Sequence, residues 1–304
     1  MPDQIVEITQ PGYWLSKSRG FLEVQSNDES QISGKIPLDD ILSVVISTPG
    51  CSLSTVLIDY LSRRNIPITI CGANYLPTTL ILPIDGYNRQ FQVMQSQTNL
   101  SAPRRKRAWQ AIVRSKIQNQ ADLLEFVGKN NMRLKRLIPN VKSGDTDNCE
   151  AQAARIYWQD LFGEDFRRDR TATDLNTPLN YIYTVIRACI ARGISSAGLH
   201  PTFSIHHKNP QNAFNLADDL IEPYRPIADC FVWKKYLNKF DQLTPEVKAS
   251  LTSIVNLQIP IEDEVSPLSL AAIKTCRSYA SYCLNEATNI LLPKLPMSLE
   301  IGAL

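Results

Sequence analysis

The spacing of apolar residues changes once along this 304-residue chain, and the change limits the folds open to it. As far as about Pro83, apolar residues form short β-branched and aromatic runs between turn residues, as in strands. From Arg104 onward they recur every three to four residues over long segments, as on the buried face of a helix. The pattern predicts an α+β protein, with a small N-terminal β-rich domain of sandwich-like type followed by a larger all-α domain.

The first region is predicted to form strands where apolar runs lie between turn residues. Its strand candidates are IVEIT, YWLSKS, FLEVQ, SVVIS, IPITI and TTLIL. The stretch between FLEVQ and SVVIS is rich in Ser, Asn and Asp and is predicted to be a loop. One helix is predicted in SLSTVLIDYLSRRN, where apolar residues follow helical spacing behind a serine that can cap the first turn.

The second region is predicted to be helical almost throughout. Its helix candidates are AWQAIVRSKIQNQADLLEFVG, EAQAARIYWQDLFG, NTPLNYIYTVIRACIARGISSAG, DDLIEPYRPIADCFVWKKYL, TPEVKASLTSIV and SPLSLAAIKTCRSYASYCLNEATNILL. We therefore assign residues 1–86 to the β-rich domain, 101–304 to the helical domain and 87–100, where polar residues accumulate, to a linker.

The positive charge is concentrated in one segment, although the whole chain has a net charge of only +2. Residues 101–142 contain 11 Lys and Arg but only two acidic residues, whereas the segments on either side are net negative. A basic segment of this kind favours a polyanion such as nucleic acid, because neutralised phosphates release condensed counterions. The alternative is a solvated helix face whose charges only keep the protein soluble.

The cysteines and the hydropathy pattern suggest a cytoplasmic protein. The seven cysteines are scattered and never form a C-x-x-C pair, which favours reduced thiols over a disulfide framework or a zinc site. No stretch has the 18 to 20 uninterrupted apolar residues of a membrane span, and MPDQIVEITQ does not resemble a signal peptide.

The candidate chemistry rests on carboxylates and histidines, because the usual phosphate-loop, dinucleotide and hydrolase-elbow motifs are missing from the sequence. Asp219 and Glu222 are three residues apart, so a helix would direct both to one face. With His207 and a third acid such as Glu150 they would suit Mg²⁺ or Mn²⁺. Alternatively, the acids of the pair lie on a solvated surface and pair with Arg225, and Glu150 only offsets a helix macrodipole.

Several sequence blocks together resemble the CRISPR-associated protein 1 family, the integrases of CRISPR adaptation. The matching blocks are E-A-Q-A-A-R-I-Y-W (150–158), N-T-P-L-N-Y-I-Y (176–183), A-G-L-H-P (197–201) and H-K-N-P-Q-N-A-F-N-L-A-D-D-L-I-E-P-Y-R-P (207–226), followed by Asp229. They occur in the family's order. The H-K-N and F-N-L-A-D-D-L-I-E-P blocks resemble the branch that accompanies single-effector, type II systems.

The resemblance implies a metal site made of Glu150, His207 and Glu222, which would be the catalytic residues. Asp219 falls on the family's nearby second acid and is expected to support the ligands. His206 stands beside the matched histidine, so the choice between His206 and His207 rests on the H-K-N register. The cofactor implied is Mg²⁺ or Mn²⁺.

The family inserts captured DNA fragments into a repeat array, joining a 3′-hydroxyl to a phosphate by transesterification. Expected partners are double-stranded DNA and CRISPR-associated protein 2. The resemblance also implies a homodimer formed through residues 1–86, with two dimers bridged by the partner, in a prokaryotic cytoplasm. The basic residues expected to contact DNA are Arg104, Arg105, Lys106, Arg107, Arg167, Arg168, Arg170 and Lys208. A structure-specific repair nuclease and a catalytically silent DNA-binding scaffold remain the alternatives.

Overall fold

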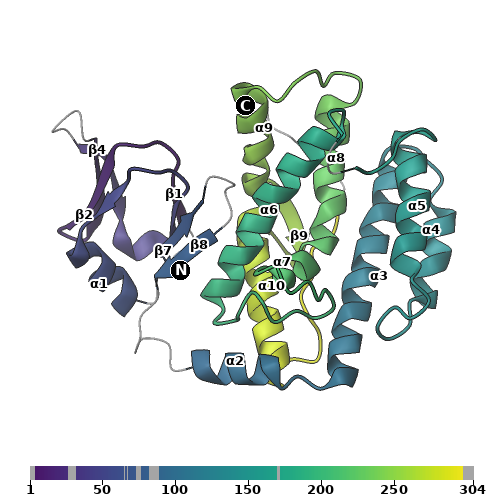
Figure 1. Ribbon diagram of the computed structural model, residues 1–304, viewed down its shortest axis with the longest axis horizontal. Coiled ribbons are helices and arrows are strands. Elements are labelled where there is room, and N and C mark those ends of the chain that lie inside the picture. The colour runs from purple at the N-terminus through teal and green to yellow at the C-terminus, as the bar shows by residue number, and fades with distance from the viewer. Residues whose placement is uncertain are drawn as a thin grey trace. The chain divides into compact units, whose positions relative to one another are not determined.

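The computed structural model describes residues 4–26, 32–64, 66, 68–72, 77–81, 89–169 and 172–296. The contacts between Cα atoms divide the chain into two compact units, Met1–Phe91 and Gln92–Leu304 (Figure 1). Each unit has its own hydrophobic core. The assignment of functions to the two domains stays a prediction.

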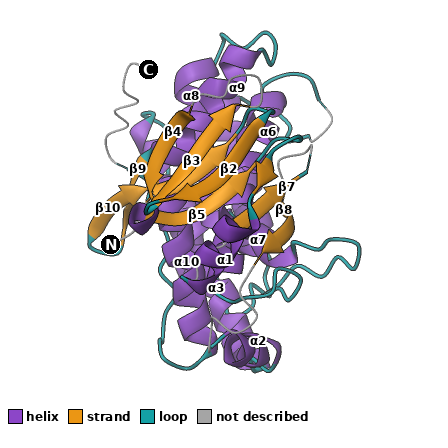
Figure 2. Ribbon diagram, turned by 90° about the vertical axis from the view of Figure 1, so that its left-hand side faces the viewer, coloured by secondary structure: helices purple, strands orange, loops and turns teal. Residues whose placement is uncertain are grey.

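The first unit contains two four-stranded sheets and a helix (Figure 2). The first sheet has the order β1 (Gln4–Ile8), β5 (Ile41–Ile46), β7 (Ile68–Cys71), β8 (Pro77–Ile81). The second has the order β4 (Ile32–Pro37), β3 (Phe21–Ser26), β2 (Tyr13–Ser18), β6 (Ser52–Leu53). In the first sheet β1, β5 and β7 run parallel and β8 antiparallel, whereas β2, β3 and β4 form an antiparallel meander.

The helix of this unit, α1 (Thr55–Arg63), begins where the sequence predicted it. The backbone N–H of Leu57 donates to the Ser54 side chain at 3.3 Å, so the serine caps the first turn. Leu57 and Leu61, one turn apart, are fully buried and pack in the core of the two sheets. Strands β4 and β6 were not predicted, because ISGKIP lacks a clear apolar alternation and β6 has only two residues.

The second unit is mostly helical. Its helices are α2 (Gln90–Thr98, which begins at the end of the first unit), α3 (Ala102–Phe126), α4 (Met132–Leu137), α5 (Cys149–Phe162), α6 (Asn176–Ser196), α7 (Asn215–Leu220), α8 (Arg225–Tyr236), α9 (Pro245–Thr252) and α10 (Leu268–Cys283). Short 3-10 helices lie at Ile138–Asn140, Glu222–Tyr224 and Ser253–Asn256, and the first unit has another at Leu38–Asp40. Helix α2 lies in the stretch predicted to be a linker. The α+β class is confirmed, but the helical region is not all-α: β9 (Gln258–Ile261) and β10 (Glu264–Pro267) form an antiparallel hairpin in it.

The predicted helix DDLIEPYRPIADCFVWKKYL is wrong in one respect that concerns the site. It is broken into α7, the 3-10 helix Glu222–Tyr224 and α8, so Asp219 and Glu222 do not belong to one continuous helix. Pro223 and Pro226 explain the break, because each removes a backbone N–H donor from the helical ladder.

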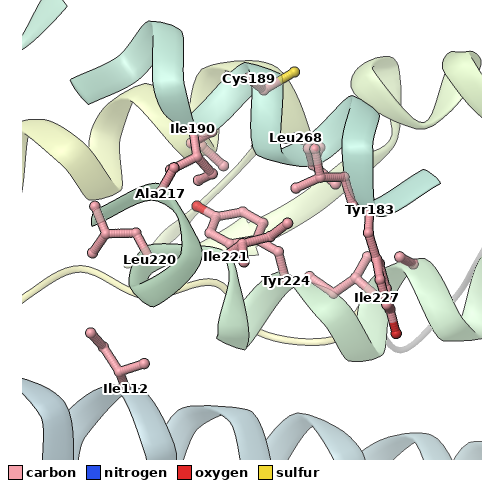
Figure 3. Packing of buried hydrophobic residues seen from close by; sticks show 14 of the residues in the cluster. Ile112, Tyr183, Cys189, Ile190, Ala217, Leu220, Ile221, Tyr224, Ile227 and Leu268 are labelled. Carbon is pink, nitrogen blue, oxygen red and sulfur yellow. The ribbon is translucent and has the colours of Figure 1, made fainter. Parts of the chain in front are cut away.

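This broken segment is packed in the core of the second unit. Figure 3 shows Leu220, Ile221 and Tyr224 between the helix that carries Ile190 and the helix that carries Ile112, and all five side chains are fully buried. The Tyr224 hydroxyl also lies 2.7 Å from Thr275 Oγ1. The backbone that carries Glu222 is therefore held from both sides.

Two further expectations concern thiols and membranes. Cys51, Cys149, Cys230, Cys276 and Cys283 are free thiols, as predicted. Within the described residues, no helix combines the length and the apolar character needed to cross a membrane.

Candidate active site

Two carboxylates from separate elements meet on one ammonium group. Glu150 lies in the first turn of α5 and Glu222 in the 3-10 helix, and Lys116 reaches both from α3. The Lys116 Nζ atom lies 2.7 Å from Glu150 Oε1 and 2.5 Å from Glu222 Oε2. All three side chains are at most 23% exposed, so the contact is largely shielded from water.

The residues before α5 fix the position of Glu150. Asn148 adopts a left-handed conformation (φ 53°), and its side chain accepts a hydrogen bond from Ala151 N. The Asp145 carboxylate accepts from the N–H groups of Cys149 and Glu150 at 2.9 and 3.0 Å. These two residues satisfy the free N–H groups of the first turn. The Glu150 side chain is therefore available to Lys116 instead of capping its own helix.

Glu222 is buried but stays ionised. Burial by itself would raise the pKa of Glu222, but the positive charges of Arg225 and Lys116 outweigh it and lower that pKa to about 2. Burial similarly opposes the charge on Lys116, yet Glu222 and Glu150 raise the pKa of its ammonium. Arg225 Nε donates to Glu222 Oε1 at 2.8 Å. The cluster thus holds two negative and two positive charges, and its net charge is zero.

One oxygen of Glu222 is poorly satisfied. Oε2 lies 2.5 Å from the Lys116 ammonium but accepts no hydrogen bond of ordinary geometry in the described structure. The distance nevertheless places the two charges in contact. A buried carboxylate oxygen without a well-directed hydrogen-bond donor is suited to bind a cation.

The imidazole of His207 is fixed by Asp219. Its Nδ1 atom lies 2.6 Å from Asp219 Oδ1, and its side chain is 43% exposed. Asp219 also accepts the backbone N–H groups of Ile205, His206 and His207. The hydrogen bond to Asp219 raises the pKa of His207 despite partial burial, and the negative charges of Glu222 and Glu150 raise it further. The Nε2 atom of His207 is therefore the ring nitrogen left for a ligand.

His206 has a different environment. Its ring stacks on Trp109, with centroids 4.3 Å apart and an interplanar angle of 3°. Trp109 also meets the His207 ring edge-on, at 5.7 Å. His206 therefore contributes a stacked ring beside the site, and His207 an oriented one.

The donor set fits a hard divalent ion, since carboxylates and an imidazole are suitable ligands for Mn²⁺ and carboxylates for Mg²⁺. The described residues nevertheless include no group of three or more His, Cys, Asp or Glu side chains placed to hold a metal ion. The Lys116 ammonium lies at the point where Glu150 and Glu222 converge. The ligand set Glu150, His207 and Glu222 therefore stays a prediction.

The sequence analysis did not single out Lys116 or Trp109. The pairing of Arg225 with Glu222 was one of its alternatives and is observed, although Glu222 is buried and not on a solvated surface. Lys116 was counted only as part of the basic segment. A signal was present: Arg105, Trp109, Ile112 and Lys116 recur at i, i+4, i+7 and i+11, which places them on one face of α3. A lysine that shares a face with buried apolar residues needs a buried anionic partner.

The basic residues expected to contact DNA fall into two groups. Lys106 and Arg107 are exposed on α3. Arg104 instead donates to the carbonyl of Tyr282 at 2.5 Å and lies over the Tyr282 ring, and Arg105 donates to the carbonyl of Leu100. Arg104 and Arg105 thus also contribute to the structure of the second unit.

The remaining basic candidates show the same mixture. Arg168 donates to the side chains of Asn176 and Asn180 and lies over the Tyr183 ring. Arg167 donates to nearby backbone carbonyls, and Arg170 lies outside the described residues. Lys208 and Arg105 together line a cavity of about 480 Å³.

The aromatic residues near the site are largely structural. The hydroxyls of Tyr157 and Tyr183 both donate to the buried carboxylate of Asp229, Tyr157 at 2.7 Å. Tyr157 is fully buried, whereas Trp158 and Tyr181 are half-buried against the core. Tyr157 thus belongs to the core of the second unit, and Trp158 and Tyr181 pack against it.

Two solved structures have the same fold. A chain of a partial Cas6-RT-Cas1–Cas2 complex superposes with a TM-score of 0.72 at 17% identity, over 94% of this chain and 96% of that one. A casposase bound to its integration product superposes with a TM-score of 0.65 at 17% identity, over 99% and 100%. The architecture, with sheets followed by a mostly helical unit, defines a protein with the Cas1-like fold.

Sequence comparison makes the assignment narrower. The model of the family "CRISPR associated protein Cas1" matches residues 6–246. The CRISPR-associated endonuclease Cas1 of Neisseria meningitidis serogroup C is 37% identical over 294 residues, which cover 95% of each chain. The chain therefore belongs to the Cas1 family, the endonucleases and integrases of CRISPR adaptation.

Proposed function

We propose that this protein inserts captured DNA fragments into a CRISPR repeat array, by attack of a fragment's 3′-hydroxyl on a repeat phosphate, with Mg²⁺ or Mn²⁺ held by Glu150, His207 and Glu222. One observation carries the proposal: Glu150 and Glu222, from different elements, converge on a single cation. Exchange of one phosphodiester for another needs no nucleotide fuel, in agreement with the missing phosphate loop.

The chemical difficulty is charge, because a hydroxyl must lose its proton beside an anionic phosphate. When bound, the divalent ion would supply positive charge that favours the deprotonated hydroxyl and the transition state. Asp219 holds the His207 ring in one orientation and leaves Nε2 free to act as a ligand. Arg225 keeps Glu222 ionised and fixes one of its oxygens.

We infer that DNA is bound mainly through its phosphates. Exposed basic residues such as Lys106 and Arg107 would neutralise phosphates without reading the bases, which suits a protein that accepts captured fragments of any sequence. The other candidate contacts are Arg104, Arg105, Arg167, Arg168 and Lys208. Lys208 is next to His207 and would lie close to the reacting phosphate.

The proposed assembly consists of two homodimers, formed through residues 1–86 and bridged by Cas2. A solved complex that contains Cas2 includes a chain of this fold, which supports Cas2 as the partner. We place the protein in the type II-like branch because of its H-K-N and F-N-L-A-D-D-L-I-E-P blocks. An enzyme that acts on the repeat array would work in the prokaryotic cytoplasm, where that DNA lies.

The test is joining of a labelled duplex into a supercoiled repeat plasmid, with and without Cas2. Glu150→Ala and Glu222→Ala should each abolish joining and leave DNA affinity within about threefold of the wild type. Glu164→Ala, at an exposed position, is the matched control and should retain activity. Undiminished joining by both site variants would refute the proposed site. Cleavage of branched DNA without joining would indicate the repair nuclease instead.

A further inference from the structure

The position of Lys116 is unusual for a lysine. Only 11% of its side chain is exposed, and it contacts two carboxylates that come from elements far apart in the sequence. Lysine is seldom buried unless it is paired, and its usual place in a basic segment is the solvent-exposed face. The ammonium therefore has a specific function between Glu150 and Glu222, beyond adding to the charge of α3.

The function of Lys116 can be inferred from the charges around it. Glu150 and Glu222 carry two negative charges, and Lys116 and Arg225 carry two positive charges. A divalent ion added between the carboxylates would give these four side chains and the ion together an excess of two positive charges in a largely buried place. Such an excess is unfavourable, because charges at short range interact strongly where water is excluded.

The two cations differ in their other contacts. The guanidinium of Arg225 is bonded to Glu222 Oε1 and lies over the Tyr183 ring, with 4.6 Å between Cζ and the ring centroid. Lys116 is instead a point charge on a flexible stem of four methylene groups. Rotation about the bonds of this stem moves the ammonium without movement of α3.

We propose that Lys116 is an internal counterion which occupies the cation position between Glu150 and Glu222, and which a divalent ion must displace. The inference rests on the proposed function, because it takes Glu150 and Glu222 as metal ligands. Lys116 is a positioning residue: it keeps the two carboxylates together in the metal-free protein. It also weakens metal binding, since each bound ion costs the two contacts that the ammonium gives up.

Competition between Lys116 and the metal predicts a change in metal affinity opposite to that expected for a supporting residue. A residue that only supported the site would lower the metal affinity when removed. Removal of a competing cation raises it, because the metal then relieves the repulsion between two carboxylates and displaces nothing. The direction of the change in affinity therefore distinguishes a competitor from a structural support.

The experiment is calorimetric titration of Mn²⁺ into the full-length protein and its variants. Lys116→Met and Lys116→Gln should bind Mn²⁺ at least about tenfold more tightly than the wild type. Lys116→Arg keeps the charge and should stay within about threefold. Unchanged or weaker Mn²⁺ binding by both neutral variants would overturn the proposal.

A further variant separates this proposal from the proposed function. Glu150→Gln should lose Mn²⁺ binding, alone and in combination with Lys116→Gln. If Mn²⁺ binds equally to the wild type and to Glu150→Gln, the metal site itself is wrong. If Glu150→Gln loses binding but Lys116→Gln binds no more tightly than the wild type, only the function of Lys116 is refuted.

Thermal unfolding distinguishes a folding defect of the variants from an effect on metal binding. Without the ammonium the two carboxylates repel each other, so Lys116→Met should have a lower Tm than the wild type in the absence of metal. Saturating Mn²⁺ should raise the Tm of Lys116→Met by more than it raises that of the wild type, because tighter ligands stabilise the folded state more. An equal or smaller rise would count against the competition.

Discussion

The carboxylate of Asp219 holds the ring of His207: Nδ1 of the imidazole lies 2.6 Å from Oδ1 of the fully buried acid. Asp219 also receives three consecutive backbone N–H groups, so the loop and the ring are fixed by one side chain. Asp219 thus orients the ring of His207, whereas the ring of His206 stacks on Trp109. A carboxylate bonded to the ring in this way is the pattern by which proteins commonly orient a ligating histidine.

The first prediction separates the two histidines. His207→Phe removes the oriented nitrogen and should abolish Mn²⁺ binding and strand joining. His206→Phe keeps a flat ring that can stack on Trp109 as His206 does. This variant should therefore retain Mn²⁺ affinity within about threefold. Calorimetry on both variants decides the question, and loss of Mn²⁺ binding in His206→Phe alone would reverse the assignment.

The second prediction concerns the contact between α6 and α10. A Cβ atom on Gly193 would lie 2.9 Å from Cys276 Sγ and 3.2 Å from the Ala272 carbonyl oxygen, and buried backbone cannot move away cheaply. Gly193→Ala should therefore lower the free energy of unfolding by roughly 1 to 3 kcal/mol, more than the gain in helix propensity. Gly34→Ala, whose added Cβ meets nothing within 4 Å, is the control and should change it by about 0.5 kcal/mol or less. Urea unfolding measures both.

The third prediction follows from the buried carboxylate of Asp229. Burial raises the pKa of Asp229 to about 6, although the hydroxyls of Tyr183 and Tyr157 oppose the shift. In the unfolded chain its pKa is about 4. Between these values the folded state binds more protons than the unfolded state, so lower pH favours folding through this group. The contribution is complete below about pH 4 and is lost as the pH rises through about 6.

The test compares the wild type with Asp229→Asn, which has no titrating group at this position. The wild-type free energy of unfolding should fall relative to the variant by roughly 2 to 3 kcal/mol between about pH 4 and pH 7. Urea unfolding at several pH values in that interval gives the difference. A constant difference between the two proteins would show that Asp229 has an ordinary pKa.

The fold was predictable where a single period lasts over many residues. The period of two gave most strands of the first unit, and Ser54 gave the start of α1. Strand β4 was missed because Gly34 and Lys35 interrupt its apolar alternation. The hairpin of β9 and β10 was missed because the charged sequence IEDE at its turn is not a typical turn sequence and lies in a region of helical pattern.

The candidate site was predictable only through matching blocks of sequence. Periodicity alone placed Asp219 and Glu222 on one helix, whereas Pro223 and Pro226 break that helix and give the two acids different partners. No local pattern brings Glu150 next to Glu222, because their approach depends on the packing of α5 and the 3-10 helix around α3. Lys116 was hidden for the same reason, since its partners are 34 and 106 residues away.

The last prediction divides the basic residues of α3 by function. Arg107 is exposed, so Arg107→Ala should leave the free energy of unfolding within about 0.5 kcal/mol and weaken DNA binding. The slope of log affinity against log salt, measured by fluorescence anisotropy between about 50 and 200 mM salt, should fall by about one for each lost phosphate contact.

Arg104→Ala should in addition lower the free energy of unfolding by roughly 1 to 2 kcal/mol, because it loses the contacts with the carbonyl and the ring of Tyr282. Lys248→Ala, at an exposed position of α9, should change neither quantity. A salt slope that is equal in Arg107→Ala and Lys248→Ala would remove Arg107 from the DNA-binding surface.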